Sequence, residues 1–501
     1  MNQIKIGAIL SYISIIFTFA VGLIYTPILI RWLGQSDYGL YSIVMSFAAY
    51  LSLMDMGVGN AIVRYIARNK AIGNSKTESD LIGQFLKFFT FIGLLTVIIG
   101  TILCLKTPAI FNNSLEHSDV VSVQVMIAIL TVNFAISFPL NVYSAVIQAY
   151  ERFIFIKLMT IVRIITVPII TLIALSLGGK LIAMTIIISL VNISILLVNY
   201  YYARVKLGLK TSFAPIDREM KKEIILYSFF IFISAMADKL YWQTDQILLG
   251  ILESSKVVAI YAVAIQLITI FASLSTGISN LFLPKLTILL SKNESQKQIN
   301  NIFEVVSKYQ YIIMMLCFSG FVLFGREFIT IWAGESYTPA YTVVLIIMIP
   351  FIVDLIQNLA LMIMQAKGTY HFRAILMIIC AFVNLLISIP VIKHFGFYGT
   401  AVVTAIFVAL GNVIVLNFYF HIKLHLNMWT YWKNIFYYTA PLIPLFLFSL
   451  YFKINITNID SIIGLILYIS VYACLYLIIT WKFILTHSER RKIRGLFKRI
   501  N

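Results

Sequence analysis

Apolar stretches of about 20 residues recur along the whole chain, separated by short segments that carry charge, glycine or proline. A helix of that length spans the roughly 30 Å hydrocarbon core of a bilayer. The pattern therefore predicts an all-α integral membrane protein with about fourteen transmembrane helices. The predicted spans are residues 8–30, 38–63, 82–105, 121–149, 154–177, 181–203, 224–249, 258–283, 303–325, 341–366, 372–392, 397–420, 432–452 and 461–482.

The composition agrees with a membrane protein. Hydrophobic residues make up 61% of the 501 residues and charged residues 12%, and the mean hydropathy is +0.95. Soluble domains are about 45–50% apolar and about 25% charged. A chain this apolar would aggregate in water, which excludes a soluble protein.

The formal net charge of +18 does not indicate a nucleic-acid-binding protein, because the basic residues lie in short loops and form no basic domain. With the N-terminus inside, the predicted inner segments hold 28 of the 38 Lys and Arg residues and the outer loops hold seven. Basic residues gather on the cytoplasmic side of membrane proteins. The sequence therefore predicts that both termini are cytoplasmic.

Two internal matches indicate a duplication. Residues 33–64 align without a gap with residues 253–284, and residues from Gln148 and from Gln365 onward match as well. The matches predict two pseudo-symmetric six-helix bundles, residues 1–222 and 223–425. An additional helix pair with a basic tail follows at 426–501. Two positions recur in the first match and are expected to serve close helix approach in both halves: Gly57 and Asn60, repeated as Gly277 and Asn280.

The orientation of the repeats favours a transporter. Both predicted halves begin inside and contain an even number of spans, so they are parallel repeats. Transporters built this way bind substrate near mid-membrane between the halves. A channel would require a filter-like loop, and the sequence has none.

Charged residues inside predicted spans are the strongest functional signal, since each costs several kcal/mol unless it meets water or a partner. Asp55 lies on a small-residue helix face and Arg163 lies near the centre of its span. Asp55 aligns with Ser275 in the repeat, so it belongs to one half only. The candidate cavity residues are Arg163, Asp55, Asp238, Lys239, Trp242, Asp245, Asp354 and Asn358.

Structural roles remain open for several of these residues. Isolated intramembrane Asn and Gln side chains often join helices rather than contact a ligand. Lys87 is close enough to the cytoplasmic end of its helix to snorkel. Lys239 and Asp245 could lie near the outer surface, in contact with water.

A cavity with cationic and amide groups suits an anionic, hydrogen-bonding cargo. An intramembrane Asp can also carry a proton or Na⁺, so transport is expected to be coupled to one of these gradients. No P-loop, GxSxG or HExxH motif is present, and the four Cys and six His residues form no metal-ligand pattern. We therefore expect no enzyme activity, no metal and no cofactor.

Five motifs resemble the polysaccharide-transporter, or Wzx-type flippase, family. They are LGQSDYGLYSIVMSF (33–47) with LMDMGVGNAIVRYIAR (53–68), QAYERF (148–153), and YWQTDQILLGIL (241–252) with YAVAIQL (261–267). The resemblance covers essentially the whole chain. The positions that match the family pattern are Asp55, Gly57, Asn60, Arg64 and Asp245.

The resemblance implies a two-bundle fold similar to that of multidrug exporters of the same superfamily, the MATE transporters. It also implies flipping of an undecaprenyl-diphosphate-linked oligosaccharide across the bacterial inner membrane, for O-antigen, lipopolysaccharide, capsule or a related polymer. The expected partners are this lipid-linked glycan, the bilayer, and a polymerase with other polysaccharide-assembly proteins. A monomer is the default for one chain with a pseudo-symmetric cavity.

Other functions remain possible at the level of sequence. A lipid II or spore-wall-type flippase, or a multidrug exporter, would share the fold. A membrane-embedded glycosyltransferase or polymerase would typically carry a large outer loop, and the longest one here, about 106–120, is short. A structural lipid-associated protein would not need the duplication or the buried charges.

Overall fold

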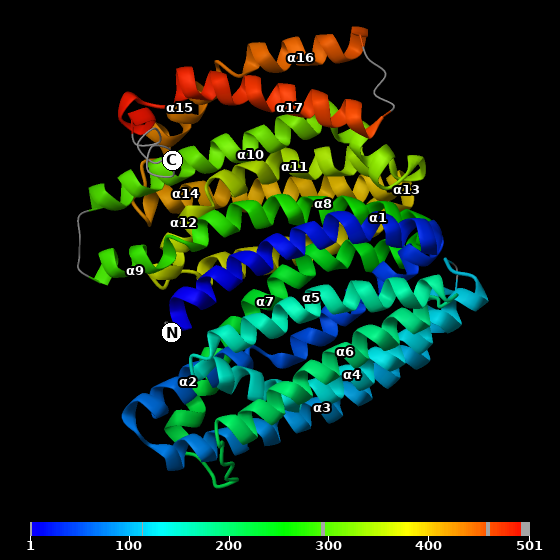
Figure 1. Ribbon diagram of the computed structural model, residues 1–501, viewed down its shortest axis with the longest axis vertical. Coiled ribbons are helices and arrows are strands. Elements are labelled where there is room, and N and C mark those ends of the chain that lie inside the picture. Colours follow the sequence, from blue (N-terminus) through cyan, green and yellow to red (C-terminus); the bar gives the residue numbers. More distant parts are fainter. Residues whose placement is uncertain (1–2, 113, 292–295, 457–460, 492–501) are drawn as a thin grey trace. The chain divides into compact units, whose positions relative to one another are not determined.

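The computed structural model describes residues 3–112, 114–291, 296–456 and 461–491, and these ranges are helical with no strand (Figure 1). Eleven of the described helices are long and apolar enough to cross a membrane, or twelve if the bent pair α15–α16 is one span. The chain is therefore a multi-pass membrane protein, as predicted. The count of fourteen spans is not confirmed.

The helices form two compact units, Met1–Ala262 with Met377–Leu385, and Val263–Leu376 with Leu386–Asn501. This boundary assigns α7 to the first unit, where it packs on α1. The division into halves at residue 222 stays a prediction. The elements of the first unit are α1 (Gln3–Leu51), η1 (Ser52–Asp55), α2 (Val58–Ile72), α3 (Ser75–Phe111), α4 (His117–Ala149), α5 (Phe153–Ser176), α6 (Leu181–Tyr201), η2 (Tyr202–Lys206) and α7 (Arg218–Leu252).

The second unit contains the C-terminal helices, and two helices, α8 and α13, have residues in both units. In the first unit α3, α4 and α6 lie side by side, and in the second unit α10 packs against α11 and α17 (Figure 1). The remaining elements are α8 (Ser255–Asn280), α9 (Leu283–Ser291), α10 (Gln296–Trp332), η3 (Glu335–Tyr337), α11 (Ala340–Ile356), α12 (Asn358–Ala366), α13 (His371–Val408), η4 (Ala409–Val415), α14 (Leu416–Ile422), α15 (Met428–Thr439), α16 (Ile443–Ile456), α17 (Ile462–Ile479) and η5 (Thr480–Ile484).

Two glycines interrupt the longest helices. At 1.5 Å per residue a straight α1 of 49 residues would be about 74 Å long, far beyond the hydrocarbon thickness. Gly34, inside α1, has φ 79° and ψ 171°, and Gly396, inside α13, has φ 60° and ψ −153°. Only glycine adopts such dihedrals readily. Both glycines lie between two spans that the hydropathy pattern separated.

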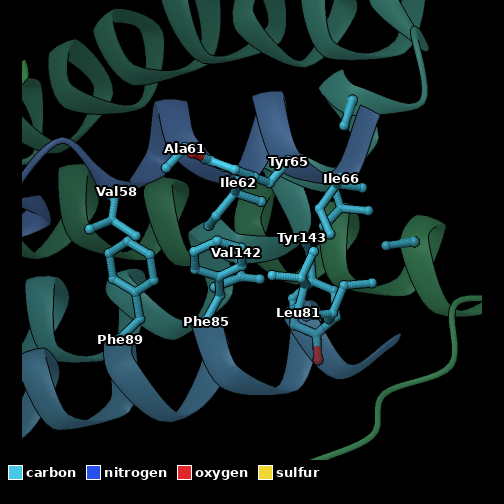
Figure 2. Packing of buried hydrophobic residues seen from close by; sticks show 14 of the residues in the cluster. Val58, Ala61, Ile62, Tyr65, Ile66, Leu81, Phe85, Phe89, Val142 and Tyr143 are labelled. Atoms are coloured by element: carbon cyan, nitrogen blue, oxygen red, sulfur yellow. The ribbon is translucent and has the colours of Figure 1, made fainter. Parts of the chain in front are cut away.

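A buried apolar cluster packs α2 onto α3 and α4 (Figure 2). The buried residues of α2 follow helical spacing and form one face of the helix. In Figure 2 Val58 points towards Phe89 of α3, and Ile62 points towards Phe85 of the same helix. This packing orients α2 and leaves its opposite face exposed, which positions the polar side chains described in the next section.

The internal duplication reappears as repeated local geometry. Phe155 stacks on Tyr202 with ring centroids 3.9 Å apart and planes at 13°, and Phe372 stacks on Tyr419 at 4.3 Å and 13°. The same offset of 217 residues relates backbone hydrogen bonds after α4 and after α12. Arg152 N donates to the carbonyl of Ile147 in one unit, and in the other the equivalent donor and acceptor are Thr369 N and the carbonyl of Met364. Each unit therefore ends these helices in the same way.

A buried ion pair anchors the end of the described chain in the second unit. Lys308 Nζ of α10 lies 2.7 Å from Glu489 Oε2, and the Lys308 side chain is 6% exposed. The same oxygen accepts hydrogen bonds from Thr486 N at 2.8 Å and Thr486 Oγ1 at 2.7 Å. Burial raises the pKa of Glu489, but the bonds to Lys308 and Thr486 outweigh it, and the net pKa lies below its ordinary value.

We expect Glu489→Gln to destabilise the protein by about 3 kcal/mol, because it leaves the Lys308 ammonium buried without its counter-charge. The folded pKa is lowered, so the stabilisation is present above the unfolded pKa of about 4.3 and is lost as pH falls through the folded value. Thermal unfolding of the purified protein at neutral and acidic pH measures this. Glu335→Gln, an exposed acid, is the matched control, and equal unfolding temperatures for both variants would contradict the prediction.

Candidate functional site

The second predicted span is broken in the middle. The α1 helix runs into the short 3₁₀ turn η1, and Met56 and Gly57 then adopt left-handed dihedrals, with φ 51° and 70°, before α2 begins. A Cβ atom on Gly57 would lie 2.8 Å from Ile231 Cβ and from the carbonyl oxygen of Ser228 in α7. Gly57 is therefore required both by the backbone conformation and by the close approach of α7.

Asp55 caps the helix that follows this break. Its carboxylate lies at the start of α2, with Oδ1 3.3 Å from the Cβ position of Gly59, where the backbone N–H groups of Gly57 and Gly59 favour its negative charge. The first N–H groups of a helix have no intrahelical partner, and a negative charge there is also favoured by the helix dipole. The structure thus supplies a local partner for this half-buried carboxylate. A role for Asp55 in a transport cavity stays a prediction.

The expected role of the repeated glycine is wrong in the second copy. Gly277 lies inside α8 and has nothing within 4 Å of its Cβ position, so it does not serve close helix approach. The second copy breaks later, at the turn formed by Leu281 and Phe282 after the exposed Asn280. The alignment failed here because the position of a helix break depends on local packing, which differs between the copies.

An exposed cationic face lies on α2. Asn60, Arg64 and Arg68 are exposed and follow one another at i, i+4 and i+8. The guanidinium of Arg64 lies over the Tyr227 ring of α7, 4.7 Å from its centroid, and Arg68 Nη1 is 3.8 Å from Glu223 Oε2. Arg68 was not singled out from the sequence. Helical spacing of the exposed polar residues is the signal that could have identified this face.

Arg163 lies exposed on α5, a helix in which only Thr171 is buried. It makes no hydrogen bond or ion pair with another residue in the part of the chain that the structure describes. Arginine exposed at the middle of a span is costly against lipid, so it needs water or an anionic ligand. The chemistry predicted for Arg163 is compatible with its position.

The polar residues of α7 differ in exposure. Asp238 is exposed, and Lys239 and Trp242 are half-buried. Asp245 is 3% exposed and accepts a hydrogen bond of 2.6 Å from the hydroxyl of Tyr261 in α8. Contact of Asp245 with water at the outer surface, one of the alternatives left open by the sequence, is therefore excluded.

Serine and tyrosine side chains of α1 bind α7 beside these residues. Ser46 Oγ lies 3.2 Å from Gln243 Oε1 and 3.0 Å from Gln246 Oε1. These contacts join two helices, which is the structural role expected of many intramembrane amides.

Asp354 and Asn358 belong to the second unit and are both buried. They flank the break between α11 and α12 at Gln357, whose amide donates to the carbonyl of Asn412 at 3.2 Å. Asn417 Nδ2 in turn donates to Gln357 Oε1 at 3.1 Å. These two candidates therefore lie in a buried polar cluster of their own unit. Throughout the described ranges no three His, Cys, Asp or Glu side chains gather as a metal site.

Residues 4–286 match the family model described as polysaccharide biosynthesis protein. A Shigella flexneri protein assigned as an O-antigen transporter is 21% identical over 394 residues, which cover 77% of this chain and 90% of that protein. A Haloferax volcanii protein assigned as a low-salt glycan biosynthesis flippase is 24% identical over 193 residues, 38% of this chain and 41% of that protein.

Solved structures of two kinds share the fold. The lipid II flippase MurJ in an inward closed conformation has a TM-score of 0.74 at 13% identity, covering 96% of this chain and 98% of that chain. An inward-facing multidrug MATE transporter has a TM-score of 0.64 at 12% identity, covering 80% of this chain and 96% of that chain. The predicted all-α, MATE-like fold is confirmed.

Substitutions at Asp55 separate capping from a charge-dependent role. We expect Asp55→Ala to destabilise the protein by about 1 kcal/mol, because the start of α2 loses its acceptor. Asp55→Asn keeps an acceptor oxygen and should retain most of the stability. Thermal unfolding of the purified variants measures both effects. If Asp55→Asn were as unstable as Asp55→Ala, the capping role would be contradicted.

Proposed function

The chain belongs to the polysaccharide biosynthesis protein family, and we propose that it flips a lipid-linked oligosaccharide across a membrane. The observation that carries this proposal is the family match over residues 4–286, together with relatives assigned as an O-antigen transporter and a glycan flippase. The cargo is an oligosaccharide repeat unit on undecaprenyl diphosphate, used for O-antigen, capsule or a related polysaccharide. The relatives are transporters and flippases, which agrees with a protein that is not an enzyme.

The exposed cations support an anionic cargo. Arg64, Arg68 and Arg163 present guanidinium groups on the first unit, and arginine binds phosphate oxygens in a bidentate manner. In the repeat alignment Arg64 faces Pro284, and at the same offset Arg68 faces Ile288 just beyond the aligned residues, so these charges belong to one copy and not to the shared fold. A drug exporter that carries cations would favour acidic groups at these positions.

A lipid II or spore-wall-type flippase is the nearest alternative. The high TM-score to MurJ is consistent with it, but that similarity concerns the fold alone. The matches to proteins assigned to O-antigen and glycan transport favour a polysaccharide repeat unit instead.

We place the protein in the bacterial inner membrane with both termini in the cytoplasm, as a monomer that works beside a polymerase and other assembly proteins. The distribution of Lys and Arg between alternate loops supports this orientation. The segments from Arg64 to Lys76 and from Arg204 to Lys222, which include helix ends and the loops between them, are then cytoplasmic.

Transport is proposed to be coupled to a proton or sodium gradient. Asp354 supports this proposal, because it is a buried carboxylate on a broken span beside amides that can supply oxygen ligands. No cofactor is needed for such a cycle.

The function is tested by complementation of a bacterial strain that lacks its repeat-unit flippase. We expect the wild-type chain to restore surface glycan and Arg163→Ala to leave lipid-linked repeat units on the cytoplasmic leaflet, because the cargo phosphates lose a cationic partner. Surface polymer is measured by immunoblot. Lipid-linked glycan is measured in membrane extracts. Lys157→Ala, a cation on the same helix, is the control. If the wild-type chain is expressed with its cognate repeat units and restores no surface glycan, the proposed function is contradicted. If Arg163→Ala restores surface glycan fully, Arg163 has no role in that function.

Coupling is tested in vesicles that contain the purified protein and a lipid-linked oligosaccharide. We expect an inward proton or sodium gradient to accelerate flipping severalfold, and Asp354→Asn to remove that acceleration while Glu335→Gln keeps it. Equal flipping rates with and without both gradients would contradict the coupling.

A further inference from the structure

An apolar groove opens on the first unit between α3 and α7, with a volume of about 540 Å³. Met56 and Val58, at the break before α2, line one part of it. Its main walls consist of aromatic and branched side chains. These include Phe85, Phe88, Phe91, Ile225, Phe229 and Phe232. Of the residues that line it, only four are polar.

The groove walls are exposed enough to hold an apolar ligand. Phe91 is 62% exposed and Phe229 is 51% exposed. Large contiguous apolar surfaces mark binding sites for apolar partners when they are hollowed rather than flat. For a membrane protein, the apolar ligand available in the bilayer is a lipid chain.

The polar residues of the groove are Gln84, Lys87, Lys221 and Ser228, and none of its lining residues is acidic. Lys87 Nζ donates to the Phe213 carbonyl at 3.1 Å, which uses one of its three N–H groups. Ser228 is 4% exposed, and its hydroxyl has no hydrogen-bond partner in the described chain. Two cations and an unpartnered hydroxyl therefore accompany the apolar wall.

The lysines lie towards one end of the groove, whereas apolar side chains line its whole length. Ser212 N donates to the Ser79 carbonyl at 3.1 Å, so the segment before α7 is tied to the beginning of α3. Lys87 and Lys221 lie towards this tied end. Phe232 lies eleven residues beyond Lys221, about 16 Å further along α7. The groove has a cationic end and an apolar continuation.

We propose that this groove binds the polyprenyl diphosphate carrier of the cargo, with the prenyl chain on the phenylalanine walls and the diphosphate between Lys87 and Lys221. The proposal rests on the proposed function and extends it, because it assigns the carrier lipid to a surface separate from Arg163. Two lysines with no lining acid match a diphosphate better than a phosphodiester, which carries a single charge. In the proposed orientation the cationic end lies towards the cytoplasm, where the carrier is loaded.

The test measures binding of undecaprenyl diphosphate to the full-length purified protein by native mass spectrometry. Undecaprenol, which lacks phosphate, and phosphatidylglycerol, an anionic phospholipid, are the comparison ligands. We expect the diphosphate to bind at least about tenfold more tightly than either, and Lys87→Gln and Lys221→Gln each to weaken it about tenfold. Lys222→Gln, the neighbouring exposed lysine outside the groove, should bind as the wild type does.

A second pair of variants tests the apolar wall. Ile225→Trp places a larger side chain in the groove and should weaken undecaprenyl diphosphate and undecaprenol alike, by about tenfold. Leu226→Trp adds the same bulk at the adjacent exposed residue, which does not line the groove, and should have no effect. Monodisperse elution and unchanged unfolding temperatures establish that the variants are folded.

Unchanged binding by the lysine variants and by Ile225→Trp would overturn the groove proposal, as would equal binding of phosphatidylglycerol. Measuring surface glycan in the complemented strain distinguishes failure of the groove proposal from failure of the proposed function. If the wild type restores glycan while the groove variants bind and transport normally, the function stands and the groove proposal falls. If the wild type restores none, the function itself falls.

Discussion

Within a bilayer, every backbone polar group must find its partner inside the protein, and this constraint accounts for the polar side chains at two of the helix breaks in this chain. After η1 the chain adopts left-handed dihedrals at Met56 and Gly57, and the Asp55 carboxylate lies beside the first backbone N–H groups of α2. At Gln357 an amide side chain bonds across to Asn412. At these two breaks the polar side chains therefore interact first with nearby backbone or amide groups.

Duplication and divergence can be told apart by geometry. The turns after α4 and after α12, and the aromatic stacks that follow them, recur with the same hydrogen bonds and interplanar angles. Features that both copies keep belong to the fold. Arg64 and Arg68 have no counterpart in the second copy, and neither does Asp55. The asymmetric residues gather around α2, which the apolar cluster of Figure 2 holds with its polar face outward.

The first unit combines two surfaces of different chemistry on either side of α7. The exposed guanidinium groups of α2 suit phosphate and sugar groups, whereas the groove beside α3 suits a hydrocarbon chain with a charged head. A lipid-linked oligosaccharide has both parts. Separate surfaces for the two parts would let a flippase move the glycan while the lipid stays in contact with the bilayer, because the hydrophobic and polar portions need not exchange environments.

The hydropathy pattern determined the class of protein and the approximate positions of the spans, because the length and apolar character of a span are local properties. Matched residues along the chain indicated the repeat. Only the tertiary structure decided which side chains are buried and which residues they contact. The sequence alone allowed contact of Asp245 with water, but in the structure its side chain is buried and hydrogen-bonded to Tyr261. Gly57 meets α7 while Gly277 meets open space, although both sit at the same repeat position. The groove was invisible in the sequence, because its walls come from segments over a hundred residues apart that only folding brings together.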